Sequence, residues 1–270
     1  MIIVGERINS TRKPITAALE AHDEAHIVNE ARRQRDTGAA YLDVNTAMMR
    51  AGEPEAMTWV IELIQNEIPE AQIAIDSANP EAVEAGFKAH QGRALLNSIN
   101  MEKERMESII PLIREHKPRV IGLTIDDNGV TQDADKRFDL GVQLIELLTK
   151  NDIDLDDIFI DPLIFPVSAE LQAGNVSLNI MGRLKEQYPG VHMVCGLSNI
   201  SFGLPERKLI NQVYMMMAMG RGLDAAIIDP LDKRMMASII TARTLLGQDK
   251  ACKGYLKAYR SDGLNLELVP

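Results

Sequence analysis

Residues 39–77 read AAYLDVNTAMMRAGEPEAMTWVIELIQNEIPEAQIAIDS and contain one complete strand–helix–strand pattern. The segments AAYLDVN at 39 and AQIAIDS at 71 are short, apolar and end in polar residues, which is typical of strands buried on both faces. Between them, four apolar side chains recur at the spacing of one helix face: Met57, Val60, Ile61 and Ile64. The stretch therefore predicts a β–α–β unit with two parallel strands.

The same pattern recurs along the whole chain. Eight short apolar segments span the chain: IIVGERIN at 2, AAYLDVN at 39, AQIAIDS at 71, RALLNS at 93, RVIGLTI at 119, DIFIDP at 157, HMVCGLSN at 192 and DAAIIDP at 224. Their spacing accommodates one strand, one crossover helix and two loops each time. Two further helix faces are predicted by Met106, Ile109, Ile110 and Ile113, and by Leu140, Leu144 and Leu148.

Eight β/α repeats with right-handed crossovers predict an α/β protein with a single (β/α)8 TIM barrel, and an open doubly wound sheet is the alternative. The length of 270 residues is that of one such barrel, so residues 1–270 are predicted to form a single domain. The charged run EARRQRD at 30–36 is predicted to be a solvated helix face. The methionine-rich run at 214–219 is predicted to be core or a dimer interface.

The composition excludes several classes of function. With 29 Lys and Arg against 39 Asp and Glu, the net charge of −10 would repel a phosphate backbone, so no nucleic-acid partner is expected. We expect no membrane association and a cytoplasmic location, because the sequence contains neither a signal-peptide pattern nor 18 consecutive apolar residues. The two cysteines, Cys195 and Cys252, have no metal-binding spacing and are expected to be reduced thiols.

The polar residues at the predicted strand ends define the candidate site, because in a (β/α)8 barrel these ends form one shared mouth. In chain order they are Glu6 and Asn9, Asp43 and Asn45, Asp76, Asn97, Asp126 and Asp127, Asp161, Ser198 and Asn199, and Asp229. Histidine is missing from this set, which argues against a catalytic zinc or a Ser-His triad. Together with the cysteine spacing, this leads us to expect no bound metal. Glycine motifs that bind nucleotide phosphates are also missing, so we expect no ATP or NAD chemistry.

Carboxylates and amides can together bind the edge of an aminopyrimidine ring such as that of a pterin. A carboxylate accepts from the amino group and the ring N–H, and an amide both donates and accepts. The alternative is that these Asp and Asn side chains only cap the helices that follow.

Seven motifs in order, GERIN at 5, LDVN at 42, DS at 76, NS at 97, GLT at 122, IDPL at 160 and GLSN at 196, resemble those of the methyltetrahydrofolate:corrinoid protein methyltransferases. This family is related to dihydropteroate synthase and to the folate domain of cobalamin-dependent methionine synthase. The resemblance implies that Asp76, Asn97 and Asp161 bind the pterin ring and that Asn199 lies beside N5 of the folate. It also implies a homodimer and a corrinoid (cobalamin) carried by a partner protein.

The predicted folate site is completed by Asp43, Ser198, Phe202 and Arg207. Phe202 departs from the family pattern, since some relatives carry a polar residue there, and it is expected either to stack on the ligand or to line the mouth. Arg207 falls on a stretch that is common in the family.

The implied reaction moves a methyl group between N5 of tetrahydrofolate and the cobalt of the corrinoid, in either direction. A tertiary amine nitrogen leaves poorly unless its charge is stabilised or a proton is delivered. The amide of Asn199 can accept a hydrogen bond from protonated N5 and so stabilise the transition state. The alternatives are a dihydropteroate synthase-like pterin transferase, which the LSN and IIDP strand ends disfavour, and a non-catalytic folate-binding module.

Overall fold

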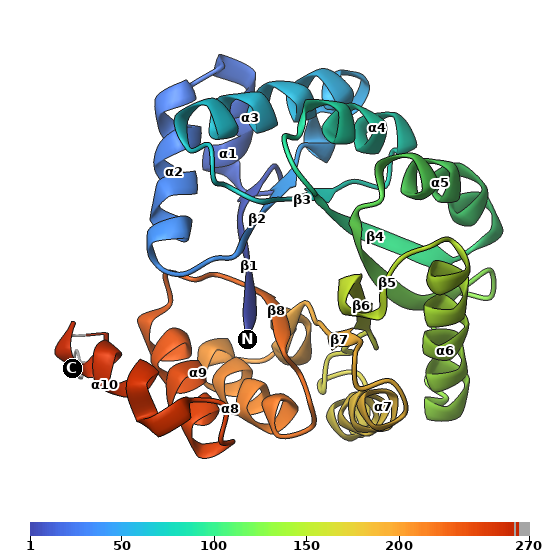
Figure 1. The fold of residues 1–270 in the computed structure, drawn as a ribbon, viewed down its shortest axis with the longest axis vertical. Helices are drawn as coiled ribbons and strands as arrows, with labels where there is room; N and C mark the ends of the chain where they lie inside the picture. The colour runs from blue at the N-terminus through green and yellow to red at the C-terminus, as the bar shows by residue number, and fades with distance from the viewer. Residues whose placement is uncertain (262, 265–270) are drawn as a thin grey trace.

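All eight predicted strands form, and they lie side by side in the computed structural model, which describes residues 1–261, 263 and 264 (Figure 1). The sheet order is β7-β6-β5-β4-β3-β2-β1-β8. The neighbouring strands in this order are parallel. Their bounds are β1 Ile2–Asn9, β2 Tyr41–Asn45, β3 Ile73–Asp76, β4 Leu95–Met101, β5 Arg119–Asp126, β6 Ile158–Asp161, β7 His192–Met193 and β8 Ala225–Ile228.

The sheet closes between its two edge strands, β7 and β8. Gly196, just beyond β7, forms an isolated parallel bridge with Ile227 of β8, and the Ile227 N–H donates to the Cys195 carbonyl at 3.0 Å. Closure confirms the predicted (β/α)8 barrel and rules out the open doubly wound sheet. The predicted seventh strand, HMVCGLSN, is much shorter than expected, because its last residues turn into a 3-10 helix.

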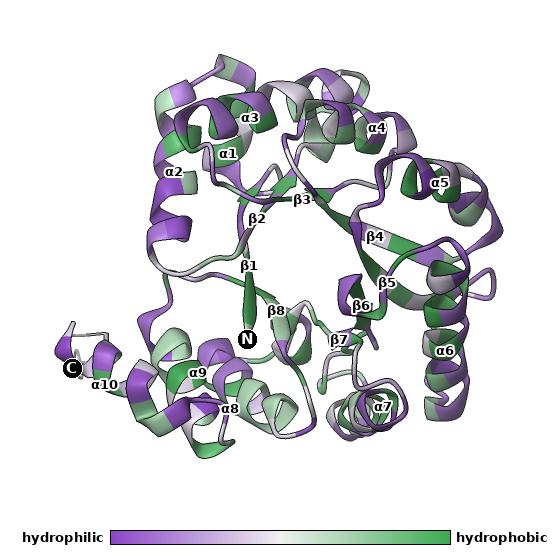
Figure 2. Ribbon diagram, viewed as in Figure 1, coloured by the Kyte–Doolittle hydropathy of each residue, from purple (hydrophilic) through white to green (hydrophobic). Residues whose placement is uncertain are grey.

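Helices surround the barrel and turn their apolar faces towards it (Figures 1 and 2). The predicted face of α3 is fully buried, and so are Ile109 and Ile113 of α5, whereas Met106 and Ile110 are only partly buried. Each fully buried side chain of this size contributes about 1.5–3 kcal/mol. The helix bounds are α1 Lys13–Ala21, α2 Glu24–Asp36, α3 Glu53–Glu67, α4 Pro80–Ala89, α5 Lys103–His116, α6 Ala134–Lys150, α7 Ala173–Gln187, α8 Arg207–Met219, α9 Lys233–Leu245 and α10 Lys253–Arg260, with 3-10 helices η1 Ala47–Gly52, η2 Leu155–Asp157, η3 Leu197–Ser201 and η4 Lys250–Cys252.

An apolar plug fills the inside of the barrel. Its buried members come from all eight strands or their direct extensions: Val4, Tyr41, Ala74, Leu95, Ile121, Phe159, Val194 and Ala225. Since side chains alternate along a strand, the residue two positions further on points to the same side. Those residues on six of the strands are Glu6, Asp43, Asp76, Asn97, Leu123 and Asp161. Beyond β7 the corresponding residue is Gly196, and the alternation on β8 passes through Ile227 to Asp229, just beyond the strand. A polar layer therefore lies directly over the plug at the carboxyl ends of the strands.

The charged run at 30–36 is not wholly a solvated face. Glu30 and Gln34 of α2 are buried against β1, where the Gln34 side-chain oxygen accepts from the Arg7 N–H at 3.0 Å. Gly5 is needed for this contact, because a Cβ at that position would lie 2.4 Å from the same oxygen. The predicted solvated face was wrong at Glu30, because the Arg7 side chain, which is distant in sequence, binds the Glu30 carboxylate at 2.7 Å.

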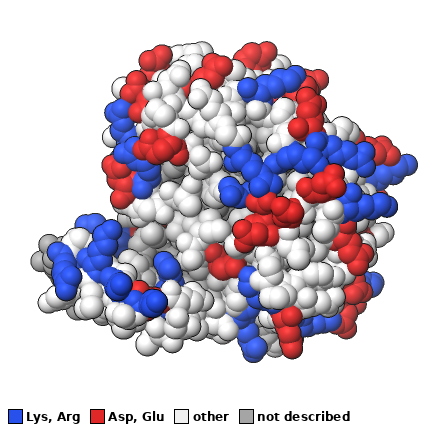
Figure 3. All heavy atoms as spheres, viewed as in Figure 1, with Lys and Arg blue, Asp and Glu red and all other residues white. Residues whose placement is uncertain are grey.

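The methionine-rich run lies on α8. Met215 and Met219 are buried, as predicted for core residues, whereas Met217 is half exposed. No helix among the described residues is both long and apolar enough to span a bilayer. Helix α10 lies at the edge of the barrel beside α9, and lysine and arginine side chains gather over it (Figures 1 and 3).

Candidate functional site

Two carboxylate–amide pairs form the centre of the polar layer. The Asn97 side-chain amide donates to Asp43 Oδ1 at 3.0 Å, and the Asn45 amide donates to Asp76 Oδ2 at 3.0 Å. The β2–β3–β4 pairing brings these side chains together, because Asp43 is in register with Ala74 and Asp76 with Asn97. Three of the predicted pterin ligands, Asp43, Asp76 and Asn97, therefore lie next to one another.

Burial changes the acidity of these carboxyl groups. It raises the pKa of Asp43 well above its ordinary range, and the neighbouring charge of Asp76 adds to the effect. Burial also raises the pKa of Asp76 to about 6. A ring that donates N–H groups to these carboxyls would favour their ionised form and so lower the raised pKa values. Strongly shifted pKa values of this kind are common at binding sites.

Asp161 ends β6 and is held by the backbone on two sides. Its Oδ1 accepts from the Leu163 N–H at 2.8 Å, and its Oδ2 accepts from the Gly196 N–H at 3.3 Å. Burial raises its pKa to about 6, although both of these hydrogen bonds act in the opposite direction. The carboxyl is thus fixed in direction and joins the turn after β6 to the turn after β7.

Asn199 lies in η3, the turn that follows β7. Its side chain is exposed, and a Cβ added at Gly196 would lie 3.6 Å from its Nδ2. Within the described residues, the Asn199 amide has no hydrogen-bonding partner from a side chain or the backbone. Such a side-chain amide is free to rotate, so its oxygen can turn to accept a hydrogen bond from a protonated ring nitrogen.

Arg207 and Phe202 lie at the rim of the mouth and not in the polar layer. Arg207 donates to the Ser198 carbonyl at 2.7 Å and to the Ser201 hydroxyl at 3.1 Å, so it supports the turn that carries Asn199. Phe202 is 63% exposed, and the Arg207 guanidinium lies 5.9 Å from its ring. Both predicted roles for Phe202, stacking on the ligand and lining the mouth, stay predictions.

The helix-capping alternative does not account for the site residues. The side chains that cap helix N-termini belong to other residues, including Asn79 at α4, Asp133 at α6 and Asp232 at α9. The Asp43 and Asp76 carboxylates instead accept from the side-chain amides of Asn97 on β4 and Asn45 on β2, and the Asp161 carboxylate accepts from the backbone of the next turns.

Two acidic residues of the polar layer, Glu6 and Asp229, fall outside the predicted folate-binding set. With Ser198, Asn211 and Lys208 they line a cavity of about 400 Å³ beside the mouth. Asp229 is paired with Arg7 at 2.7 Å. Burial, and next the charge of Asp229, raise the pKa of Glu6 to about 7. Both residues belong to the strand-end set that the sequence predicts, although the resemblance assigns neither of them to the folate.

The buried Glu6 carboxyl predicts a pH-dependent stability. Its pKa of about 7 in the folded protein exceeds its ordinary value of 4.5. The contribution of this carboxyl to the free energy of unfolding is therefore fully present below about pH 4.5 and is lost as the pH rises through about 7. Glu6→Gln is therefore expected to raise the free energy of unfolding at pH 8 by no more than about 3 kcal/mol, and the thermal midpoint with it. At pH 4 the same substitution is expected to change the midpoint little. Thermal unfolding at both pH values tests this expectation, with Glu20→Gln on the exposed face of α1 as the control. An equal effect at both pH values would contradict it.

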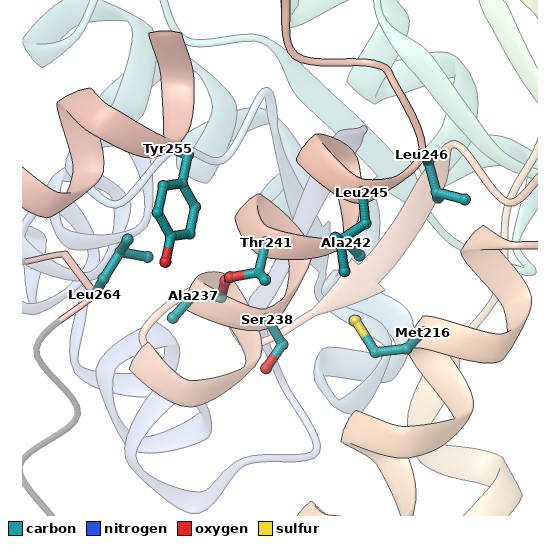
Figure 4. A pocket seen from close by; sticks show the side chains of 9 residues that line it. All are labelled: Met216, Ala237, Ser238, Thr241, Ala242, Leu245, Leu246, Tyr255 and Leu264. Atoms are coloured by element: carbon teal, nitrogen blue, oxygen red, sulfur yellow. The ribbon is translucent and has the colours of Figure 1, made fainter. Parts of the chain in front are cut away.

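A second cavity, of about 540 Å³, lies away from the strand ends, between α8, α9 and α10 (Figure 4). Its lining is mostly apolar and its polar side chains are the hydroxyls of Ser238, Thr241 and Tyr255. It therefore lacks the carboxylates and amides that a pterin edge requires. Among residues 1–261, 263 and 264, no group of three or more His, Cys, Asp or Glu side chains is arranged to hold a metal.

The fold and the site together define a class: a (β/α)8 barrel whose mouth is lined with buried carboxylates and amides able to bind the edge of a pterin-like ring. The chain belongs to the pterin-binding enzyme family, whose model matches residues 5–229. It is 35% identical over 263 residues to the methylcorrinoid:tetrahydrofolate methyltransferase of Eubacterium limosum, covering 96% of both chains. This family membership confirms the resemblance found in the strand-end motifs.

One further relative and one solved structure also resemble this chain. Methionine synthase of Mycobacterium tuberculosis is 30% identical over 242 residues, which are 84% of this chain and 20% of that protein. The structure of dihydropteroate synthase from Xanthomonas albilineans, in complex with indole-2-carboxylic acid and 6-chloroguanine, has a TM-score of 0.66 at 18% identity and covers 93% of this chain and 92% of that one. This second likeness concerns the fold alone.

Proposed function

We propose that this protein is a methyltransferase that moves a methyl group between N5 of tetrahydrofolate and the cobalt of a corrinoid carried by a partner protein. The full-length similarity to the methylcorrinoid:tetrahydrofolate methyltransferase carries this proposal. The polar layer supports it independently, because its carboxylates and amides suit the edge of a pterin.

In this proposal Asp76, Asn97 and Asp161 bind the pterin ring, and Asp43 orients Asn97 through their 3.0 Å hydrogen bond. Ser198 lies in the turn stabilised by Arg207, and Phe202 lines the opening through which the partner approaches. The corrinoid supplies the cobalt that receives or gives the methyl group. The protein's own contribution is to bind and orient the folate and to stabilise charge at N5.

The proposed catalytic residue is Asn199. N5 of methyltetrahydrofolate first takes up a proton from solvent, and the Asn199 side-chain oxygen accepts a hydrogen bond from this charged N–H. The methyl group then passes to the cobalt, and the C–N bonding pair stays on N5, which is left as a neutral N–H amine. In the opposite direction this neutral amine takes up the methyl group and then releases its proton to solvent. The Asn199 amide dipole stabilises the positive charge on N5.

We propose further that the protein is a homodimer and is located in the cytoplasm. A reducing compartment suits both the free thiols of Cys195 and Cys252 and a reduced cobalt. Light scattering tests the proposed dimer by measuring the molar mass of the protein in solution. A monomeric mass would remove this part of the proposal and leave the methyl transfer untouched.

The proposed reaction predicts that the purified protein converts methyltetrahydrofolate and cob(I)alamin to tetrahydrofolate and methylcobalamin. Free cobalamin replaces the corrinoid of the partner protein. The absorbance change is followed without oxygen under reducing conditions, and the reverse reaction starts from methylcobalamin and tetrahydrofolate. Binding of folate without any absorbance change in either direction would instead favour a non-catalytic folate-binding module. Condensation of a pterin pyrophosphate with p-aminobenzoate would favour the dihydropteroate synthase-like alternative.

A further inference from the structure

Arg137, on α6, is a fully buried arginine that lies outside the barrel, behind the turn that follows β6. Its Nη1 donates to the Leu163 carbonyl at 2.7 Å and to the Pro162 carbonyl at 3.0 Å. Its guanidinium lies 5.0 Å from the ring of Phe165 in the same turn. One side chain thus contacts three residues of the four that follow Asp161.

The turn held by Arg137 has an unfavourable backbone conformation. Leu163 has a φ of 59°, in the left-handed region that a residue with a branched side chain rarely adopts. On one side of this residue the Leu163 N–H donates to Asp161 Oδ1 at 2.8 Å, and its unusual φ sets the direction of the carbonyl that accepts from Arg137. Contacts from outside the turn must stabilise this conformation, and Arg137 provides two hydrogen bonds on the side opposite to Asp161.

A buried arginine is costly unless its charge is used. The Nε and Nη2 atoms of Arg137 have no hydrogen-bonding partner among the described residues. A charge with unmet donors in an apolar setting destabilises the fold, so packing alone does not explain it. The charge does act on the site, because it favours the ionised form of the buried Asp161 carboxyl.

We propose that Arg137 is a positioning residue for folate: it fixes the turn after β6 so that Asp161 faces the pterin ring. This inference rests on the proposed function, since it assigns a role to Asp161 in folate binding. The other titratable groups that face Asp161 are Cys195, beyond β7, and Tyr214 of α8. Neither is positively charged, so Arg137 is the cation that acts on this carboxyl.

The role has an electrostatic consequence that a purely structural residue would not have. Burial raises the pKa of Asp161, and the hydrogen bonds from Leu163 and Gly196, followed by the charge of Arg137, lower it. Removing the positive charge therefore raises this pKa further, and folate binding that needs the ionised carboxylate is lost at a higher pH. A lysine keeps the charge but cannot keep the planar stacking on Phe165 or both carbonyl contacts with the same geometry.

The test compares Arg137→Met, Arg137→Lys and the control Lys136→Gln, which removes an exposed charge from the same helix. Affinity for methyltetrahydrofolate is measured by calorimetry from pH 5 to pH 8, after thermal unfolding has established that each variant is folded. Loss of one or two hydrogen bonds from a charged group is expected to weaken binding about tenfold in Arg137→Lys and about 100-fold in Arg137→Met. The acid limb of binding is expected to move to higher pH in Arg137→Met only.

Folate binding within twofold of the wild type in a folded Arg137→Met protein would overturn the inference. If Arg137→Met does not fold, Arg137→Lys decides in the same way. An equal loss in the Lys136→Gln control would also overturn it, because the effect would then be one of net charge. Failure of the wild-type protein to bind folate would instead overturn the proposed function, so the two failures are distinguishable.

Discussion

Asn199→Ala is expected to lower the rate of methyl transfer about 10²–10³-fold while it changes folate affinity much less. The side chain has no protein partner among the described residues, so its removal leaves no buried group unsatisfied. Its proposed hydrogen bond forms with N5 only as that nitrogen becomes protonated, and loss of a donor or acceptor of this kind typically costs this much in rate. Single-turnover consumption of cob(I)alamin measures the rate, and calorimetry with methyltetrahydrofolate measures the affinity.

Asn199→Asp provides a second measurement at the same position, because aspartate keeps an oxygen that can accept from protonated N5. Its rate is expected to lie between those of the wild type and the alanine variant. Asn175→Ala, on α7, removes an amide whose own contact is with Gln172, and it serves as the control. Unchanged turnover in Asn199→Ala would remove this residue from the mechanism.

Asp161→Ala is expected to weaken folate binding by about 10²-fold or more, and to harm binding at least as much as rate. The variant loses the carboxylate that accepts from the pterin, and it also leaves the N–H groups of Leu163 and Gly196 without their acceptor. Hydrogen bonds to a charged group contribute about 1.5–3 kcal/mol each, which corresponds to this loss of affinity. Calorimetric titration with methyltetrahydrofolate measures it.

Asp156→Ala removes an exposed carboxylate from η2, the turn just before β6, and serves as the control. Asp161→Asn keeps the shape of the side chain and separates charge from size, since its amide can still accept one hydrogen bond. Wild-type affinity in Asp161→Ala would show that the polar layer binds folate without this residue.

The barrel was predictable because its signals are local. Each strand combines a short apolar segment with a polar end, and each helix face repeats within a few residues, as Met57, Val60, Ile61 and Ile64 do. The central part of the site followed from the same regularity. Asp43, Asp76, Asn97 and Asp161 each lie two positions beyond a residue of the apolar plug, so the alternation of a strand brings them to one layer.

The supporting residues could not be predicted in this way, because their partners are distant along the chain. Arg7 binds Glu30, 23 residues away, and Asp229, 222 residues away. Arg137 reaches the turn after β6 from a helix whose sequence is amphipathic, and a charged residue in such a helix is normally assigned to the solvent side. Arg105 likewise binds the Ser77 and Ala78 carbonyls after β3 and the Ser98 carbonyl within β4.

The place where the barrel closes has a bearing on motion. Strand β7 has only 2 residues, and the ring closes through the isolated bridge at Gly196, three positions before Asn199, and through backbone hydrogen bonds from Asp224 to Met193 and from Ile227 to Cys195. Few backbone hydrogen bonds therefore hold the segment that enters the Asn199 turn, and a shift of that turn would break little of the parallel ladder. Strands β2, β3 and β4, by contrast, pair directly with one another on the other side of the cylinder, so a displacement of this turn would leave the wall that carries Asp43, Asp76 and Asn97 intact.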